Sequence, residues 1–196
     1  MSLGRFEHVI LTRYNLGLYE RDDAEEWMEH RMGYFVETRK SVLSQEVDFK
    51  WLVCVDPKTP EEWLDRIFTD SRMVPHFAHP NTYRSVGWTI TTRFDNDDIY
   101  LPGALRAIQD AFIPEEIAVD IKYLQLYKDE LYTSERTQPN SPFISLIENG
   151  ARRTCYARPH TKMLEDFKAK FASDEVYAYM VIHENNLGNK LVGRKV

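Results

Sequence analysis

Short apolar runs rich in β-branched residues recur through the first half of the chain, separated by polar segments with helical spacing. Residues 8–12 and 49–56 have the pattern of buried strands, and residues 24–43 between them have the pattern of a helix. A second helix is predicted after the second strand, because Thr59 suits its N-cap and Pro60 suits its first turn. Strand, helix, strand and helix in this order predict a parallel sheet in a three-layer α/β fold.

The second half of the chain has a less regular pattern. Residues 117–126 and 127–132 have the aromatic, partly alternating character of strands, which predicts a mixed or antiparallel addition to the sheet. A helix is predicted over residues 161–172 and a last strand over residues 176–182. We therefore expect a single α/β domain over residues 1–196, with a mostly parallel mixed sheet.

A cluster of carboxylates follows a third apolar segment, residues 87–92. Asp95, Asp97 and Asp98 lie in the run Arg-Phe-Asp-Asn-Asp-Asp, and a helix is predicted to begin near Pro102. Carboxylates this close repel and raise one another's pKa, and a hard divalent cation such as Mg²⁺ or Mn²⁺ offsets that repulsion. The sequence therefore predicts a metal that carries a phosphorylated ligand at this turn.

Other interpretations of the acidic turn fit the sequence to different degrees. Counting from Asp95 as the first residue of a calcium loop places Ile99, Tyr100 and Arg106 where an oxygen ligand, a glycine and a glutamate are needed, which excludes an EF-hand. A P-loop is excluded because no Gly-rich run ends in Gly-Lys-Ser/Thr. An acidic turn that caps the following helix stays open as the alternative to a metal site.

Polar residues follow several predicted strands at the point where each strand ends. Arg13, Asp56 and Asp95 come just after three successive strands, and His183 follows the last one. Ligands of parallel α/β sheets bind beyond the carboxyl ends of the strands. We therefore expect these side chains, together with Asp97, to line one crevice.

Composition and charge narrow the function classes. A formal net charge of −6 argues against general binding of nucleic acid or of anionic membranes. No apolar run approaches the ~20 residues of a membrane helix and no signal peptide opens the chain, so we expect a soluble, cytoplasmic protein. Cys54 and Cys155 form neither a disulfide framework nor a zinc-binding pattern. The first four residues, Met1-Ser2-Leu3-Gly4, have the character of a cloning remnant.

Four segments, taken in order, resemble one family of enzymes. They are Leu-Thr-Arg-Tyr-Asn at 11–15, Arg-Phe-Asp-Asn-Asp-Asp at 93–98, Ser-Pro-Phe-Ile-Ser-Leu-Ile-Glu at 141–148 and Val-Ile-His-Glu-Asn-Asn at 181–186. With these segments the chain resembles a bacterial family of rhamnosyltransferases and, more broadly, the GT-A-fold glycosyltransferases. The resemblance implies a GT-A-like nucleotide-diphospho-sugar transferase fold, in which an Asp-X-Asp motif binds a metal on the donor diphosphate.

The resemblance also implies roles for individual residues. The implied ligands of Mn²⁺ or Mg²⁺ are the acids of the turn and the late histidine, namely Asp95, Asp97, Asp98 and His183. The implied contacts of a UDP- or dTDP-linked sugar donor are Arg13, Asp56, Arg93 and Asp95. Glu148 is the candidate general base toward a glycan or other hydroxyl acceptor, because it follows an apolar run in the half of the fold that normally handles the acceptor.

Simpler roles stay open for each of these residues. Asp56 also suits a turn, Arg13 and Arg93 suit salt bridges, His183 suits a structural hydrogen bond, and Glu148 suits a solvated surface. The chain lacks a Glu-Asp followed by Gln-X-X-Arg-Trp, which marks the base in many such transferases, so a non-catalytic sugar-nucleotide or glycan-binding module is one alternative. A nucleotidyltransferase is the other, although the segment after the first strand is poor in glycine.

Overall fold

The structure is a computed structural model that describes residues 6–134, 137–184 and 190–196. The expectations about residues 1–4, and Asn185 and Asn186 of the last motif, lie outside the described residues. The helices are α1 (Ala24–Leu43), α2 (Glu61–Ile67), α3 (Ala104–Asp110) and α4 (Met163–Asp166). The strands are β1 (Glu7–Arg13), β2 (Lys50–Cys54), β3 (Met73–His76), β4 (Trp88–Arg93), β5 (Ile99–Tyr100), β6 (Ile117–Tyr127), β7 (Glu130–Thr133), β8 (Ser145–Asn149) and β9 (Ala169–Val181).

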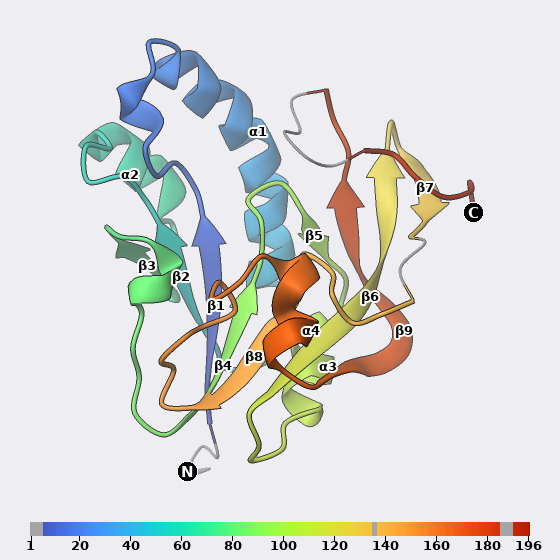
Figure 1. The fold of residues 1–196 in the computed structure, drawn as a ribbon. Helices are drawn as coiled ribbons and strands as arrows, with labels where there is room; N and C mark the ends of the chain where they lie inside the picture. The colour runs from blue at the N-terminus through green and yellow to red at the C-terminus, as the bar shows by residue number, and fades with distance from the viewer. Residues whose placement is uncertain (1–5, 135–136, 185–189) are drawn as a thin grey trace.

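The strands form a mixed sheet in the order β3-β2-β1-β4-β8-β6-β9-β5, with β7 beside β6. The part built from the first half of the chain is parallel, since β3 pairs with β2, β2 with β1 and β1 with β4 in parallel. Strand β8 runs antiparallel between β4 and β6, and β9 is parallel to β6. The carboxyl ends of β1, β2, β4, β6 and β9 therefore meet at one edge, which is uppermost in Figure 1.

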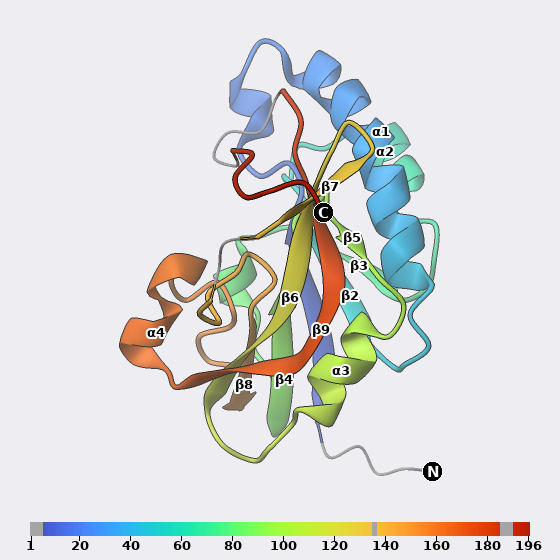
Figure 2. The same ribbon diagram turned by 90° about the vertical axis from the view of Figure 1, so that its right-hand side faces the viewer.

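Helices cover both faces of this sheet (Figure 2). Helices α1, α2 and α3 lie on one face, and each contributes buried side chains to one core cluster, among them Phe35, Trp63 and Leu105. The opposite face is covered by α4 and the chain before it, where Tyr156 and Met163 belong to a second core cluster. The predicted α/β class is confirmed, with the sheet between two helical layers.

Most elements expected from the pattern are present. Helix α1 confirms the prediction over residues 24–43, and β1, β2 and β4 confirm the predicted strands of the first half. The predicted helix over residues 161–172 is wrong, because helical structure there is limited to α4 and a short 3-10 turn at His160–Lys162. Ala169 pairs with Ala118 of β6, so hydrogen bonds to the sheet replace helical ones from that point. Strand β3 was not expected from the pattern.

No helix within residues 6–134, 137–184 and 190–196 is both long enough and apolar enough to cross a membrane.

A series of buried polar side chains, joined by hydrogen bonds, crosses the middle of the sheet. His8 of β1 is 3% exposed, and its Nε2 lies 2.8 Å from the Oγ1 of Thr92 in β4. Thr92 in turn lies 2.7 Å from the hydroxyl of Ser145 in β8, while Gln109 of α3 contacts the other ring nitrogen of His8 at 3.2 Å. Burial lowers the pKa of His8 from 6.5 to about 3. The imidazole is therefore neutral in the folded protein at neutral pH.

This buried histidine makes stability depend on pH. Because the unfolded chain binds a proton at His8 near pH 6.5 and the folded chain only near pH 3, stability is fully present above pH 6.5 and is lost as pH falls toward 3. We expect the wild type to lose ~2 kcal/mol of unfolding free energy from this group between about pH 7 and pH 5. Urea unfolding of His8→Gln should lack this component, whereas the half-buried His76→Gln control should retain it. Equal pH dependence in both variants would contradict the assignment.

Candidate functional site

The acidic turn lies at the carboxyl edge of the sheet, between β4 and β5, and is tied to two neighbouring strands. The backbone N–H of Phe94 donates to the Leu11 carbonyl of β1 at 3.2 Å, and the side-chain amide of Asn96 donates to the Tyr14 carbonyl at 3.1 Å. On the other side, the Val181 N–H at the end of β9 donates to Oδ1 of Asp98 at 3.0 Å. These contacts hold the turn between the ends of β1 and β9.

Asp97 is the centre of the turn's electrostatics. Its Oδ2 accepts a hydrogen bond from Nη1 of Arg31 at 2.5 Å, and it lies 2.9 Å from Nε2 of His183. The side chains of Asp97 and Arg31 are only 8% and 10% exposed. The guanidinium of Arg31 also lies 5.2 Å from the centre of the Trp27 ring, one helical turn earlier on α1. Residues from α1, from the end of β4 and from the end of β9 thus converge on one carboxylate.

Neighbouring acids of the turn have opposite pKa directions. Burial alone would raise the pKa of Asp97, but the hydrogen bond from His183 and the charge of Arg31 together lower it. Burial, followed by the charges of Asp97 and Asp95, raises the pKa of Asp98 well above its usual range. Oδ2 of Asp98 is buried and has no hydrogen-bond partner among the described residues. Of these two adjacent acids, Asp97 is therefore the anionic one, and Asp98 favours the protonated form in this arrangement.

Asp95 and Arg93 lie beside this centre, toward the face that carries α4. Nη2 of Arg93 is 3.4 Å from both carboxylate oxygens of Asp95, which is the long limit of a hydrogen bond. The guanidinium lies 4.9 Å from the centre of the Tyr156 ring, and its buried Nε has no hydrogen-bond partner among the described residues. Arg93 therefore brings a loosely paired cation to the edge of the acidic turn.

Arg13 and Asp56 both follow strand ends at the same edge, as predicted. Arg13 ends β1 and is exposed. Asp56 is 8% exposed, and its carboxylate accepts hydrogen bonds from the backbone N–H groups of Gly17 and Lys58, each at 2.8 Å. Thr59 does not cap α2 with its side chain; its hydroxyl instead donates to the Asp56 carbonyl at 2.6 Å. Asp56 thus holds the loop after β1 in place, which is the turn role left open by the sequence.

The structure does not bring Glu148 to the acidic turn. Glu148 pairs with Thr89 at the start of β4, because β8 runs antiparallel to β4, whereas the turn follows the end of β4. Its side chain is 1% exposed and accepts hydrogen bonds from Nε of Arg153 and from the Thr154 N–H, both at 3.0 Å. Glu148 is therefore not placed to act as general base on a ligand at the acidic turn, since a base must reach the reacting hydroxyl.

Mn²⁺ or Mg²⁺ at this turn would have few protein ligands. Within the described ranges, no group of three or more His, Cys, Asp or Glu side chains is gathered tightly enough to hold a metal. Asp97 and His183 nevertheless converge as a pair, and carboxylate and imidazole are ligands that suit Mn²⁺. Mg²⁺ and related ions are commonly held by one or two carboxylates, with substrate phosphates and waters completing the coordination. A metal held by this pair would therefore need further ligands from outside the protein, such as phosphate oxygens and water.

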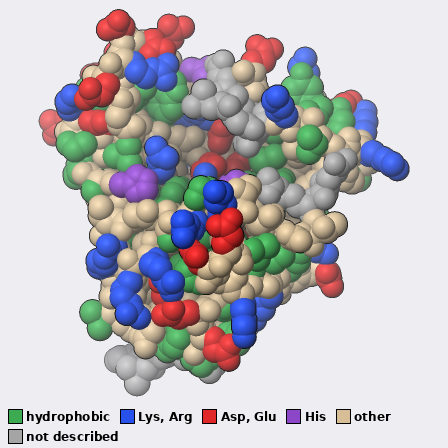
Figure 3. Space-filling view, viewed as in Figure 1, with side chains coloured by type: hydrophobic (Ala, Val, Ile, Leu, Met, Phe, Trp, Pro, Cys, Tyr) green, Lys and Arg blue, Asp and Glu red, His purple; other side chains and the backbone are tan. Residues whose placement is uncertain are grey.

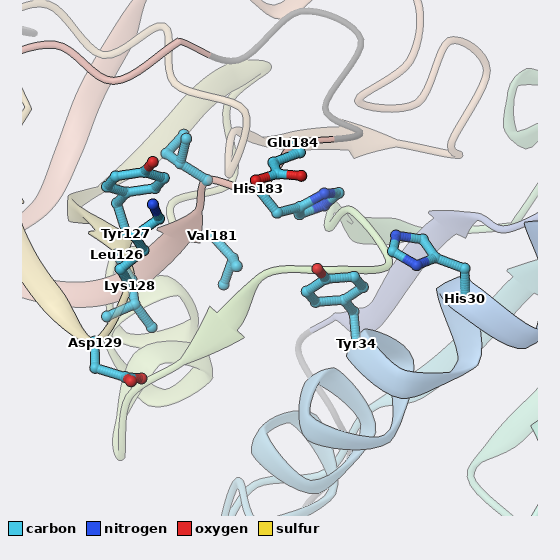
Figure 4. Close-up of a pocket in the computed structure, with 10 residues that line it drawn as sticks. His30, Tyr34, Leu126, Tyr127, Lys128, Asp129, Val181, His183 and Glu184 are labelled. Atoms are coloured by element: carbon cyan, nitrogen blue, oxygen red, sulfur yellow. The ribbon is translucent and has the colours of Figure 1, made fainter.

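A pocket adjoins this centre through His183. It has a volume of about 340 Å³, and its walls come from α1 and from the hairpin that joins β6 to β7 (Figure 4). The ring of His183 stacks on Tyr34 at 4.3 Å and 18°, and His30 lies edge-on to both rings. In the space-filling view, acidic side chains lie at the floor of a hollow in the middle of the face seen in Figure 1 (Figure 3).

Sequence reasoning missed the contribution of α1 to the site. Arg31 was treated only as part of a helix, yet it provides the cation closest to Asp97. A usable signal was present in the pattern, because Trp27, Arg31 and Tyr34 have the i, i+4, i+7 spacing of one helix face. This stripe lies next to the buried stripe that contains Met28 and Phe35, so a charged residue in it lies at the edge of the core.

Comparison with known protein families finds no family model that matches this chain, and comparison with curated proteins finds no match.

The buried ion pair gives a first prediction for this site. Arg31→Met should lower the free energy of unfolding by ~3 kcal/mol, because it leaves the buried Asp97 without its strongest cation. The matched control is Arg21→Met, which removes an exposed pair with Asp23 and should cost less than ~1 kcal/mol. Urea unfolding at neutral pH measures both values. Adding Asp97→Asn to Arg31→Met should restore part of the loss, and equal costs for the two arginines would contradict this account.

Glu148 gives a second prediction. Glu148→Gln should lower the free energy of unfolding by ~2 kcal/mol. The amide N–H₂ group of glutamine cannot accept a hydrogen bond, so one of the two donors, Arg153 Nε or the Thr154 N–H, would lose its buried acceptor. Glu116 provides the control, since it pairs with the same Arg153 but is 40% exposed, so that Glu116→Gln should cost less than ~1 kcal/mol. Thermal unfolding measures the stability of both variants. Ligand binding at the acidic turn should be unchanged in Glu148→Gln, and its loss in a folded variant would return Glu148 to the site.

Proposed function

We propose that this chain is a metal-dependent glycosyltransferase, which moves a sugar, with rhamnose as one candidate, from a nucleotide-sugar donor to a glycan or other hydroxyl acceptor. The observation that carries the proposal is the approach of Asp97 and His183 to 2.9 Å at the carboxyl edge of the sheet. These residues are 86 positions apart in the chain and follow different strands. Open α/β sheets bind ligands at this edge, and the four segments that resemble glycosyltransferases include both residues.

Asp97 and His183 would be the protein ligands of Mn²⁺ or Mg²⁺. Arg31 keeps Asp97 ionised in the absence of a metal, so that the carboxylate is ready to act as an anionic ligand. When bound, the metal supplies positive charge that stabilises the departing nucleoside diphosphate. Asp98 serves the turn mainly by accepting the Val181 N–H, which fixes the end of β9 and hence the position of His183.

The donor side of the site would lie toward β1 and β2. Arg93 offers donors that are weakly engaged by Asp95, and a guanidinium of this kind suits a phosphate oxygen. Arg13 adds an exposed cation at the end of β1. Asp56 contributes indirectly, because its bonds to Gly17 and Lys58 shape the loop that would border the nucleotide. Because the Gly17 N–H is already donated to Asp56, it is not available to a phosphate, which disfavours the phosphate loop of a nucleotidyltransferase.

A non-catalytic module that binds a sugar nucleotide or glycan is the second candidate. It is favoured by the placement of Glu148, which leaves the proposed reaction without an assigned base. Donor hydrolysis or transfer in the presence of Mn²⁺ separates the two candidates, because only an enzyme turns over its donor.

A metal-linked binding test addresses the proposal directly. UDP- and dTDP-linked sugars are screened with and without Mn²⁺. The matching donor, at about 100 times its Kd, should raise the melting temperature by several degrees.

Asp97→Asn should abolish the Mn²⁺-dependent part of nucleoside diphosphate binding in calorimetry, because it removes the anionic ligand. Asp110→Asn, at the exposed end of α3, is the matched control and should bind normally. Mn²⁺-linked affinity that is equal in Asp97→Asn and wild type would overturn the site.

A further inference from the structure

The pocket beside His183 has walls of distinct chemistry. Tyr34 and His30 of α1 form one wall, and Tyr127 and Lys128 of the β6–β7 hairpin form the other (Figure 4). Val181 and Ile182, at the end of β9, complete the apolar lining. A volume of about 340 Å³ lies at the lower end of the range for small-molecule sites, which suits a ligand of one or two rings.

Aromatic rings are held in place on both walls. Tyr34 is fixed by the His183 ring stacked on it at 4.3 Å, and Tyr127 is partly buried against the core with the ammonium group of Lys128 5.1 Å from its ring centre. Lys128 and Asp129 form the hairpin turn with φ angles of 48° and 63°, so both occupy the left-handed region without being glycine. The turn thereby brings an amino group and a carboxylate to the rim of an aromatic pocket.

Such a combination matches the surface of a sugar ring. Pyranose rings present C–H groups on their faces, which pack on aromatic rings, and hydroxyl groups at their edges, which bond to charged and polar side chains. Lys128 can donate to a hydroxyl, and Asp129 and Glu184 can accept from one. Both signs of charge are present at the rim, so a strongly anionic ligand has no advantage there.

We propose that this pocket is a saccharide subsite, which holds the acceptor sugar with a hydroxyl directed toward the Asp97–His183 centre. Its role as acceptor site rests on the proposed function, whereas saccharide binding itself does not. His183 joins the two sites, because its ring lines the pocket and its Nε2 lies 2.9 Å from Asp97. A hydroxyl bound against His183 would therefore lie next to the place where the donor diphosphate is held.

Saccharide binding is measured on the full chain without donor or metal. Methyl glycosides of rhamnose, glucose, galactose and N-acetylglucosamine are titrated by calorimetry and by ligand-observed NMR, with uracil as a planar ring that carries no sugar. At least one glycoside should bind, and Tyr127→Ala should weaken it about tenfold by removing one aromatic wall. Tyr132→Ala is the matched control, because Tyr132 lies on the same hairpin, bonds Glu130 at 2.9 Å and does not line the pocket.

The outcomes separate this inference from the proposed function. The inference is overturned if no glycoside binds, if Tyr127→Ala and Tyr132→Ala behave alike, or if uracil shows the Tyr127 dependence in place of a glycoside. Mn²⁺-linked nucleoside diphosphate binding is measured in parallel on the same samples. Glycoside binding without nucleotide binding would overturn the transferase and keep the saccharide pocket, whereas nucleotide binding without glycoside binding would do the reverse.

Discussion

The contact between Arg31 of α1 and Asp97 after β4, at 2.5 Å, joins the helical layer to the carboxyl edge of the sheet. Both side chains are almost fully buried, so each would be costly without the other. The bond requires α1 to lie across the ends of the strands, and the same placement packs Met28 and Phe35 of α1 into the core. The ion pair at the carboxyl edge of the sheet and the packing of α1 on the core therefore require the same position of α1.

Asp97 and Asp98 are adjacent in the turn but favour opposite protonation states. Asp97 is ionised because Arg31 and His183 surround it, whereas Asp98 is buried near like charges and accepts a backbone hydrogen bond from Val181. Opposite shifts in the pKa values of two neighbouring carboxyl groups relieve the repulsion between them, because only one of the two is then charged. The two acids also have different roles. Asp97, which is ionised, is suited to bind a cation, and Asp98 connects the turn after β4 to the end of β9. A cluster that looks like a set of equivalent ligands in sequence thus contains groups of different kinds.

Much of the sheet and one edge of the site could be predicted from sequence, because their causes are local. Apolar runs followed by polar residues place Arg13, Asp56 and Asp97 at strand ends, and parallel order then brings those ends together. Glu148 was expected at the same edge but lies near the other end of β4. The sequence around Glu148 does not indicate that β8 runs antiparallel to β4. The helix expected over residues 161–172 failed for a similar reason, since pairing of Ala169 with β6 overrides local propensity. Arg31 could be placed on a helix but not opposite Asp97, which depends on the crossing of α1 over the sheet.

His183 is oriented by contacts of two different kinds. Its Nε2 faces Asp97, while the plane of its ring is set by stacking on Tyr34. A single hydrogen bond would leave the imidazole free to turn about its own axis, and stacking alone would leave it free to slide, so the two together define one position. Because Tyr34 also forms a wall of the adjoining pocket, a ligand that fills the pocket would press on the same ring that aligns His183. In the proposed reaction, an acceptor in the pocket would therefore act through Tyr34 on the alignment of His183 and on the geometry at Asp97.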